Sequence, residues 1–435
     1  MIVILMLAII VPTWVAVLAL VALVFFASSL FGGLLGPMPR YRMMNADEMP
    51  PNDSDRFLEV VEALADAGLN RAGDLTVLTN GPSFYPAELE AIRSATQSVN
   101  LEAYIFAKGE IARQYVEALT DRAKAGVNVN VVIDAFGSAG TGKSFFAPLV
   151  NAGGKVRWYN GPRWYSLMHL DNRTHRELMI VDGKIGFIGG AGIADQWYSG
   201  TKGQPRWRDS AVRIMGEAVY NLQATFAENW LAASGELLVG DEYFPHIQNE
   251  HRLISLVVNS TPTVGGSTRA RILFQLLLAS AKRSISVTTP YFLPDRGLTE
   301  ELCRAVERGL RVRILVPGRK SDHMVTRSTS RAGYGRLLKA GAEVYEYQAA
   351  MIHAKVLCVD DLWVVVGSTN FDNRSFGIND EVNLAIRDHA VAARFENDMA
   401  HDLELSRRVS LQEWRHRPLT ERATELMGLV FERQQ

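Results

Sequence analysis

The feature of this sequence that most restricts its fold is an internal duplication, in which four blocks recur in the same order. The first three pairs are residues 94–106 with 280–292, 125–138 with 308–322, and 151–159 with 339–347. In both copies apolar strand-like segments alternate with segments of helical periodicity, which indicates α/β units around a largely parallel sheet. We therefore predict two tandem α/β/α sandwich halves, residues 45–245 and 246–435, the second ending in a C-terminal helix.

The fourth block of the second copy carries groups that can act on a phosphodiester. On an extended strand residues i and i+2 point to one face, so His353 and Lys355 present an imidazole and a cation together. A largely neutral imidazole can attack phosphorus, and a second histidine from the other copy can protonate the leaving oxygen. Lys355, the Asn370 amide and backbone amides near Gly367 and Ser368 can hold the phosphoryl oxygens. This chemistry needs no metal and no other cofactor.

The fourth block of the first copy keeps the histidine and the aspartate, His175 and Asp182, but departs at two positions. Glu177 stands where the second copy has lysine, and Gly192 where it has asparagine. An anion in place of a cation repels a phosphodiester, so we expect Glu177 to be protonated, turned away, replaced in its role by another cation, or bound to a substrate hydroxyl. Arg176 should face away from His175. The alternative is a decayed first copy in a slow or inactive protein.

Residues 353–370, HAKVLCVDDLWVVVGSTN, resemble the HxK(x)4D(x)6GSxN signature of the phospholipase D superfamily at every position. Within that superfamily, residues 288–295, 371–381, 206–214 and the apolar N-terminal segment are similar to bacterial cardiolipin synthases. The resemblance covers about residues 85–430. It implies two halves in pseudo-twofold symmetry, each contributing one histidine to a shared site, and a phosphohistidine intermediate that water or an alcohol resolves.

The resemblance also implies roles for individual residues. Glu381 and Asp209 would orient the catalytic histidines. His175 would be the nucleophile, and His353 the general acid and then the general base. The full set of expected catalytic residues is His175, His353, Lys355, Asp182, Asp360, Asn370, Glu381 and Asp209, and the expected substrate-binding residues are Ser368, Glu177 and Gly367.

The N-terminus predicts a membrane anchor. The first 39 residues carry no charged side chain, and residues 2–27 are almost wholly apolar, which is long enough to span a bilayer. A signal peptide is the alternative, but the segment lacks the positively charged residues with which a signal peptide begins. We expect residues 1–40 to form the anchor, which ends in a segment rich in glycine and proline. Arg40 and Arg42 are the first cations, so the remainder of the chain is expected to lie in the cytoplasm. The expected membrane is a bacterial inner membrane.

Two other motifs suggest different functions. Residues 137–144 match the Walker A pattern after an apolar strand, which predicts a P-loop nucleotide site if a helix follows. His169, Asp171 and His175 resemble part of a metal site, but no further ligand follows at a familiar spacing. The basic, tryptophan-containing C-terminal segment could rest on anionic lipid headgroups, although a helix packed on the domain is the simpler interpretation.

The sequence as a whole favours a membrane-anchored phosphatidyltransferase that makes cardiolipin from two phosphatidylglycerol molecules. Alternatives are a phospholipase D that hydrolyses phospholipids, a nuclease of the same superfamily, a P-loop protein, and a catalytically weak phospholipid-binding module. Lys and Arg total 46 against 47 for Asp and Glu, so no nucleic-acid partner is expected. The oligomeric state is left open.

Overall fold

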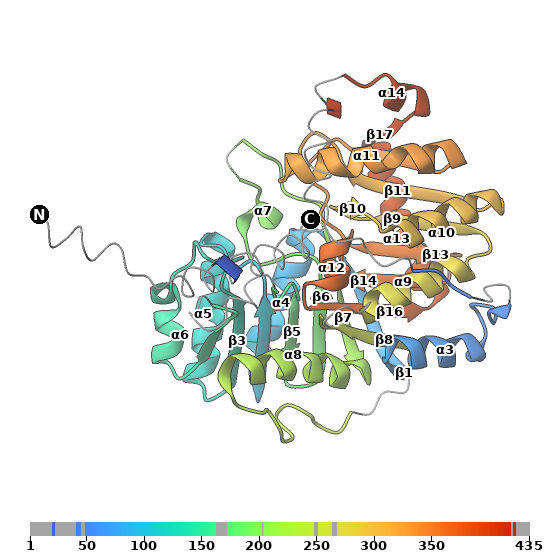
Figure 1. Ribbon diagram of the computed structural model, residues 1–435. Helices are drawn as coiled ribbons and strands as arrows, with labels where there is room; N and C mark the ends of the chain where they lie inside the picture. Colours follow the sequence, from blue (N-terminus) through green and yellow to red (C-terminus); the bar gives the residue numbers. More distant parts are fainter. Residues whose placement is uncertain are drawn as a thin grey trace, which may run out of the picture.

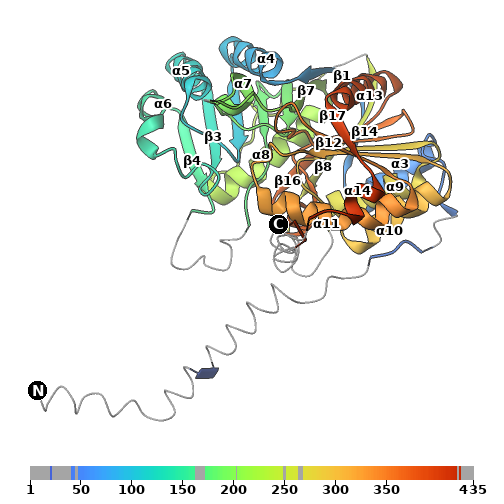
Figure 2. The same ribbon diagram turned by 90° about the horizontal axis from the view of Figure 1, so that it is seen from above.

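The structure is a computed structural model that describes residues 20–21, 41–44, 48–161, 172–201, 203–247, 251–262, 268–418 and 421–422. Its central feature is one sheet of fifteen strands that runs through both halves of the chain. Figure 1 and Figure 2 show the two halves side by side along this sheet.

The elements of the first half follow a helix, α3 (Asp55–Ala65). Its strands are β1 (Gly68–Thr79), β2 (Ser98–Ala103), β3 (Asn128–Asp134), β4 (Lys155–Tyr159), β5 (Leu178–Val181), β6 (Ile185–Gly189) and β7 (Ser210–Gly216). Its helices are α4 (Gly81–Ser94), α5 (Glu110–Lys124), η2 (Lys143–Phe146), α6 (Ala147–Asn151), α7 (Asp195–Tyr198) and α8 (Ala218–Ser234).

The second half repeats this series. Its strands are β8 (Arg252–Ser260), β9 (Ser284–Thr288), β10 (Phe292–Leu293), β11 (Arg311–Pro317), β12 (Glu343–Tyr347), β13 (Val356–Val359), β14 (Trp363–Gly367), β15 (Phe371–Asp372), β16 (Glu381–Arg387) and β17 (Ser406–Val409). Its helices are α9 (Arg269–Ser280), α10 (Arg296–Glu307), α11 (Met324–Ala340), α12 (Asn373–Gly377), α13 (His389–Glu404) and α14 (Leu411–Arg415).

The strand order confirms that the halves are repeats. The order is β17-β12-β11-β9-β13-β14-β16-β8-β1-β7-β6-β5-β2-β3-β4. The central antiparallel pair is β1 and β8. Apart from β17 at one edge, every strand on one side of this pair has its counterpart from the other copy at the same place on the other side. The duplicated blocks of sequence therefore occupy equivalent places on opposite sides of this pair.

The prediction of a largely parallel sheet is wrong. Parallel pairing occurs only among β2, β3 and β4 and among β9, β11 and β12, and the other pairs of the large sheet are antiparallel. The cause is the shortness of some connections, because only three residues join β5 to β6 and β13 to β14. A parallel pair needs a crossover of a dozen or more residues, so these strands can only form hairpins.

Alternating side chains of the strands pack into cores on both faces of the sheet. In β5, Met179 and Val181 pack with α4 and α5, whereas Leu178 and Ile180 point to the opposite face. The core on that opposite face also contains side chains of α8, α13 and second-half strands, and β14 contacts β6 and β7. The two halves therefore share one core in addition to having one each.

The helix α3 lies on the second half, beside α9 (Figure 1). Phe57, Leu58 and Val61 are fully buried in the second-half core. Just before the helix, the Asn52 amide donates to the Asp360 carboxylate at 2.7 Å. This packing differs from the predicted division, in which the first half begins at residue 45.

Both chain ends were predicted to carry special segments. The predicted anchor lies outside the described residues apart from Leu20 and Val21, and no helix in the described part of the chain is long and apolar enough to cross a bilayer. The predicted C-terminal helix beyond residue 422 is likewise outside them. Trp414 is partly buried, and its indole donates to the Arg331 carbonyl of α11 at 2.7 Å, which favours packing over lipid contact.

Candidate active site

Each of the two motif histidines is held where one half meets the other. His175, just before β5, donates its backbone N–H to the Asp380 carbonyl of the second half at 2.9 Å. His353, just before β13, donates to the Arg208 carbonyl of the first half at 2.7 Å. These short parallel bridges fix both backbones against the facing half. Because the motif recurs at equivalent positions, the backbones of the two histidines are held in equivalent ways.

The expected orienting carboxylates bind the histidines crosswise between the halves. Nδ1 of His175 lies 3.0 and 3.1 Å from the two carboxylate oxygens of Glu381, in the second half. Nδ1 of His353 lies 2.8 Å from Oδ2 of Asp209, in the first half, which also accepts from the Trp197 indole at 3.0 Å. A carboxylate at Nδ1 favours the proton there and leaves the Nε2 lone pair for chemistry.

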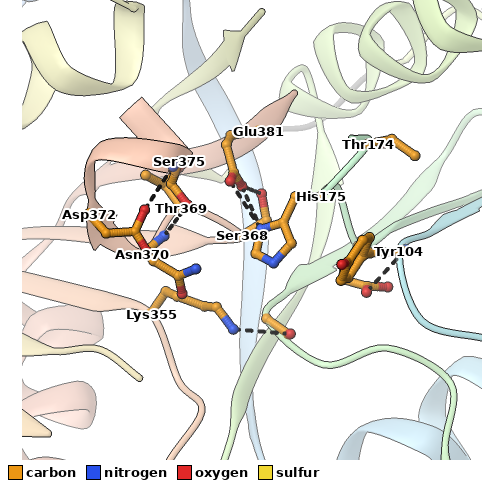
Figure 3. A network of polar contacts seen from close by, with 12 residues as sticks. Tyr104, Thr174, His175, Lys355, Ser368, Thr369, Asn370, Asp372, Ser375 and Glu381 are labelled. Carbon is orange, nitrogen blue, oxygen red and sulfur yellow. Dashed lines mark hydrogen bonds and ion pairs between the residues drawn. The ribbon is translucent and has the colours of Figure 1, made fainter. Parts of the chain in front are cut away.

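Both imidazoles line one cavity of about 520 Å³, as the sequence predicted. Figure 3 shows His175 between Glu381 and the pair of Lys355 and Asn370. The other residues lining the cavity are Tyr104, Ile105, Phe136, Arg173, Glu177, Gly190, Trp197, Trp207, Tyr291, Asp322, His323, Thr326, Asn370, Asp372, Arg374 and Asn379. The lining thus contains three imidazoles, two arginines, three carboxyl groups and aromatic walls, and its basic groups suit an anionic phosphodiester on an apolar carrier.

Lys355 spans the gap between the halves. Its Nζ lies 2.8 and 3.1 Å from the two ring nitrogens of His353 and donates towards the Gly190 carbonyl of the first half at 3.4 Å. Burial and then the charge of Lys355 lower the pKa of His353, while Asp209 opposes this shift, so a proton on this imidazole is held less tightly than usual. Burial lowers the pKa of Lys355 as well. For Asp209 burial alone would raise the pKa, but the His353 hydrogen bond and Lys355 outweigh it and lower it.

Asn370 faces the cavity as expected, whereas Ser368 and Gly367 do not line it. Oδ1 of Asn370 is buried and has no hydrogen-bond partner among the described residues, so this acceptor is available to a donor such as a substrate hydroxyl, whereas only the Nδ2 amide could bind a phosphoryl oxygen. The Ser368 hydroxyl instead donates to Glu381 (Figure 3), and Gly367 packs closely on the backbone of β16. Ser368 and Gly367 are therefore not placed to contact substrate. They instead hold Glu381 and its strand, and Glu381 in turn holds His175.

Asp182 and Asp360 lie at the far ends of β5 and β13 from the histidines and do not line the cavity. The Asp182 carboxylate accepts backbone N–H groups of residues 96–98, and Asp360 accepts those of residues 282–284. Their inclusion among residues that touch substrate is thus corrected: each fixes the start of a neighbouring strand, β2 or β9. The motif spacing places them there because four strand residues separate them from the catalytic end.

This position predicts that Asp360→Ala loses stability and keeps turnover. Removing the acceptor of three backbone amides should lower the free energy of unfolding by about 2–3 kcal/mol, measured by urea unfolding. The kcat of the folded fraction should stay within about threefold of wild type. Asp361→Ala is the matched control, since Asp361 also has positive φ and its side chain is 55% exposed. A large loss of kcat at unchanged stability would contradict the assignment.

Aromatic residues around the two imidazoles were not predicted as part of the site. The Tyr104 ring lies 5.1 Å from that of His175, and Trp197 and Trp207 lie 5.2 and 5.4 Å from that of His353. The duplication contained a signal for one of them, because the first repeated block of each copy places a tyrosine, Tyr104 or Tyr291, just after the strand. Both tyrosines line the cavity.

The structure contradicts the P-loop alternative for residues 137–144. The Ser138 hydroxyl donates to the Tyr104 carbonyl and accepts the Phe106 N–H, both at 2.8 Å, and Thr141 accepts the Lys108 N–H. The four-residue 3-10 helix η2 follows, in place of the long helix whose N-terminus would bind phosphates. His169 and Asp171 of the suggested metal site lie outside the described residues.

Comparisons with known proteins agree with this geometry. A family model described as "Cardiolipin synthase, PLD-like domain" matches residues 89–230 and 275–403, one stretch in each half. Cardiolipin synthase 1 of Bacillus anthracis is 35% identical over 81% of this chain and 72% of its own length. The major cardiolipin synthase ClsA of Bacillus subtilis is 34% identical over 82% of this chain and 74% of its own length.

Among solved structures, a phosphatidylserine synthase of Haemophilus influenzae Rd KW20 superposes with a TM-score of 0.67 at 14% identity, over 86% of this chain and 99% of that one. That similarity shows the fold. With a family match in both halves and relatives above 30% identity over most of the chain, this protein belongs to the cardiolipin synthase family of phospholipase D-like proteins.

Proposed function

We propose that this protein is a membrane-anchored phosphatidyltransferase that makes cardiolipin from two phosphatidylglycerol molecules. The observation that carries the proposal is that His175 and His353 line the same cavity. Each imidazole is held at Nδ1 by a carboxylate of the other half. The names of the relatives supply the lipid. Two histidines on one cavity provide a nucleophile and a proton donor for one phosphodiester.

In the first step Nε2 of His175 attacks the phosphorus of one phosphatidylglycerol. The P–O bond to the glycerol headgroup breaks, and protonated His353 gives its proton to the departing oxygen. His175 is proposed as the nucleophile because its Nε2 has no partner among the described residues, whereas Nε2 of His353 lies 3.1 Å from Lys355. Lys355 and Asn370 hold the non-bridging oxygens.

In the second step the phosphatidyl group leaves His175 for another lipid. His353, now neutral, takes the proton of a terminal glycerol hydroxyl on a second phosphatidylglycerol, whose oxygen attacks phosphorus. The P–N bond breaks, cardiolipin leaves, and both imidazoles return to their first states. Water competes with the lipid hydroxyl, so the aromatic walls formed by Tyr104, Trp197 and Trp207 favour the synthase reaction by limiting solvent.

The proposed anchor is a single helix within residues 2–27 in a bacterial inner membrane, with the catalytic part in the cytoplasm. The charge-free start and the cations Arg40 and Arg42 support this topology. Between them, the Tyr41 ring packs under the Arg271 guanidinium, 4.0 Å from its centre. The anchor would therefore enter the membrane beside the second half.

The test is incubation of the purified full-length protein in detergent with phosphatidylglycerol labelled in its acyl chains, followed by separation of the lipid products. We expect labelled cardiolipin together with one released glycerol per cardiolipin. Phosphatidate without cardiolipin would overturn the proposal in favour of a hydrolytic phospholipase D. If neither product forms, the catalytically weak lipid-binding alternative is correct.

A further inference from the structure

The two departures of the first half from the second lie side by side in the structure. The second half places Lys355 against His353 and Asn370 on the cavity, and the first half has Glu177 and Gly192 at the corresponding sequence positions. Like Lys355, Glu177 lies two residues after its histidine on an extended segment. It also lines the catalytic cavity. Its carboxyl group is therefore not turned away from the site.

The glycine at position 192 makes room for this carboxyl group. A Cβ there would lie 2.5 Å from the Ile105 carbonyl oxygen and 3.0 Å from Oε1 of Glu177. Oε1 accepts the backbone N–H groups of Tyr104 at 3.2 Å and Ile105 at 3.4 Å. The backbone of Ile105 therefore excludes an asparagine at position 192, and Oε1 of Glu177 lies beside the same space.

The surroundings decide the charge of the carboxyl group. Burial raises the pKa of Glu177 well above its ordinary value, and nearby Asp209 adds to the effect. The backbone amides and Lys355 oppose it only in part. The titratable groups that surround Glu177 or share a cavity with it are Lys355, Asp209, His175, His353, His323, Arg173, Arg374, Asp322, Asp372, Glu88, Glu102, Tyr85, Tyr104, Tyr115 and Tyr291. Burial therefore favours the protonated form of this carboxyl group.

We propose that Glu177 binds the substrate directly, by donating a hydrogen bond from its carboxylic acid to a non-bridging oxygen of the phosphodiester between His175 and His353. This inference rests on the proposed function and adds a residue to it. With Oε1 occupied by two amides, the Oε2 hydroxyl is the part of Glu177 left to face a ligand. A phosphodiester carries one negative charge, which Lys355 already balances, so a neutral donor suffices in the first half.

The test compares Glu177→Gln, Glu177→Lys and wild type in the lipid assay from pH 6 to pH 9.5. Glutamine keeps a neutral donor and an acceptor, so its turnover at neutral pH should stay within about threefold of wild type. Lysine cannot accept the two amides and faces Lys355, so we expect a loss of about tenfold or more. Glu90→Gln, at an exposed position of α4, is the matched control and should change neither rate nor pH profile.

The pH profile separates binding from mere packing. Wild-type activity should fall as the pH rises through the pKa of Glu177, because the carboxylate neither donates nor attracts the substrate. In Glu177→Gln this part of the alkaline fall should disappear, and only the fall caused by other groups such as Lys355 should persist. Gly192→Ala should lower turnover by about tenfold, because its methyl group would lie 2.5 Å from the Ile105 carbonyl oxygen and would shift the segment whose amides hold the Glu177 carboxyl group.

The outcomes also distinguish this inference from the proposed function. Wild-type protein that forms cardiolipin supports the function whatever the variants do. If Glu177→Lys is then as fast as wild type or faster, or if Glu177→Gln keeps the wild-type alkaline profile, the inference is overturned and the first half is a decayed copy. Thermal unfolding of each variant shows whether a loss of turnover reflects a loss of folded protein.

Discussion

Replacing His175 with alanine is expected to lower cardiolipin formation by at least about a thousandfold, because it removes the nucleophile that the proposed mechanism needs. His353→Ala should lower it by about 10² to 10⁴-fold, the range for loss of a general acid and base. The two variants should differ with a phosphodiester whose leaving group is p-nitrophenol, since that group departs without a proton. His353→Ala should then accumulate a phosphohistidine enzyme, and His175→Ala should not.

The measurement is release of p-nitrophenol together with mass spectrometry of the acid-sensitive histidine adduct after a rapid quench at neutral or alkaline pH. His401→Ala is the control, because this side chain is 74% exposed and far from the motif in sequence. An adduct that forms in His175→Ala and not in His353→Ala would exchange the two roles. Full activity in both variants would falsify the mechanism.

Replacing Arg176 with methionine should have the largest effect on stability. This guanidinium is fully buried between the motif and α8, donating to the Thr225 carbonyl at 2.9 Å and to Glu228 at 2.7 Å. Its charge also lowers the pKa values of the buried Glu102 and Asp380, which burial raises. Removing one partner of such a cluster costs about 3–5 kcal/mol, because buried carboxylates lose their counter-charge.

The pH dependence of this loss has a defined sign. Burial raises the pKa of Glu102 to about 7, so the folded state holds its proton more tightly than the unfolded state. Stability therefore decreases as the pH rises above the ordinary range of a glutamate and becomes constant above about pH 7. Without Arg176 the pKa rises further, so the difference between variant and wild type should be larger at pH 8 than at pH 6.

Urea unfolding at the two pH values measures this difference. Arg56→Met is the control, since that arginine is 73% exposed and its ion pair with Glu59 lies on the surface. A loss for Arg176→Met below about 1 kcal/mol, or one that shrinks with rising pH, would show that the cluster does not depend on the guanidinium.

The sequence predicted the local part of this site correctly. The strand periodicity places His175 on the cavity side and Arg176 on the opposite side, and the structure has this alternation. The motif spacing could not separate Asp182 from the groups that touch substrate. In a sequence, an aspartate that accepts backbone amides cannot be told from an aspartate that faces a ligand. The difference depends on the position of β2 in the fold, whose first amides bind Asp182.

Long-range packing was the other limit. Nothing near residue 57 indicates that α3 belongs to the second half, because its partners on α9 are more than 200 residues away. The sheet has fewer parallel pairs than the periodicity predicts because Asp182 and Asp360 are hairpin turns as well as motif positions. Both have positive φ, as tight turns between antiparallel strands require.

The crosswise pairing of histidines and carboxylates limits how this gene can change. A fragment ending in the connection between α8 and β8 would contain His175 without Glu381, and the other fragment would contain His353 without Asp209. Neither fragment could inherit a working centre, even if it folded. The ancestral repeat unit must have worked as a symmetric pair, and once fused, its two descendants can diverge in sequence, as at Glu177, but cannot be separated or lost one at a time.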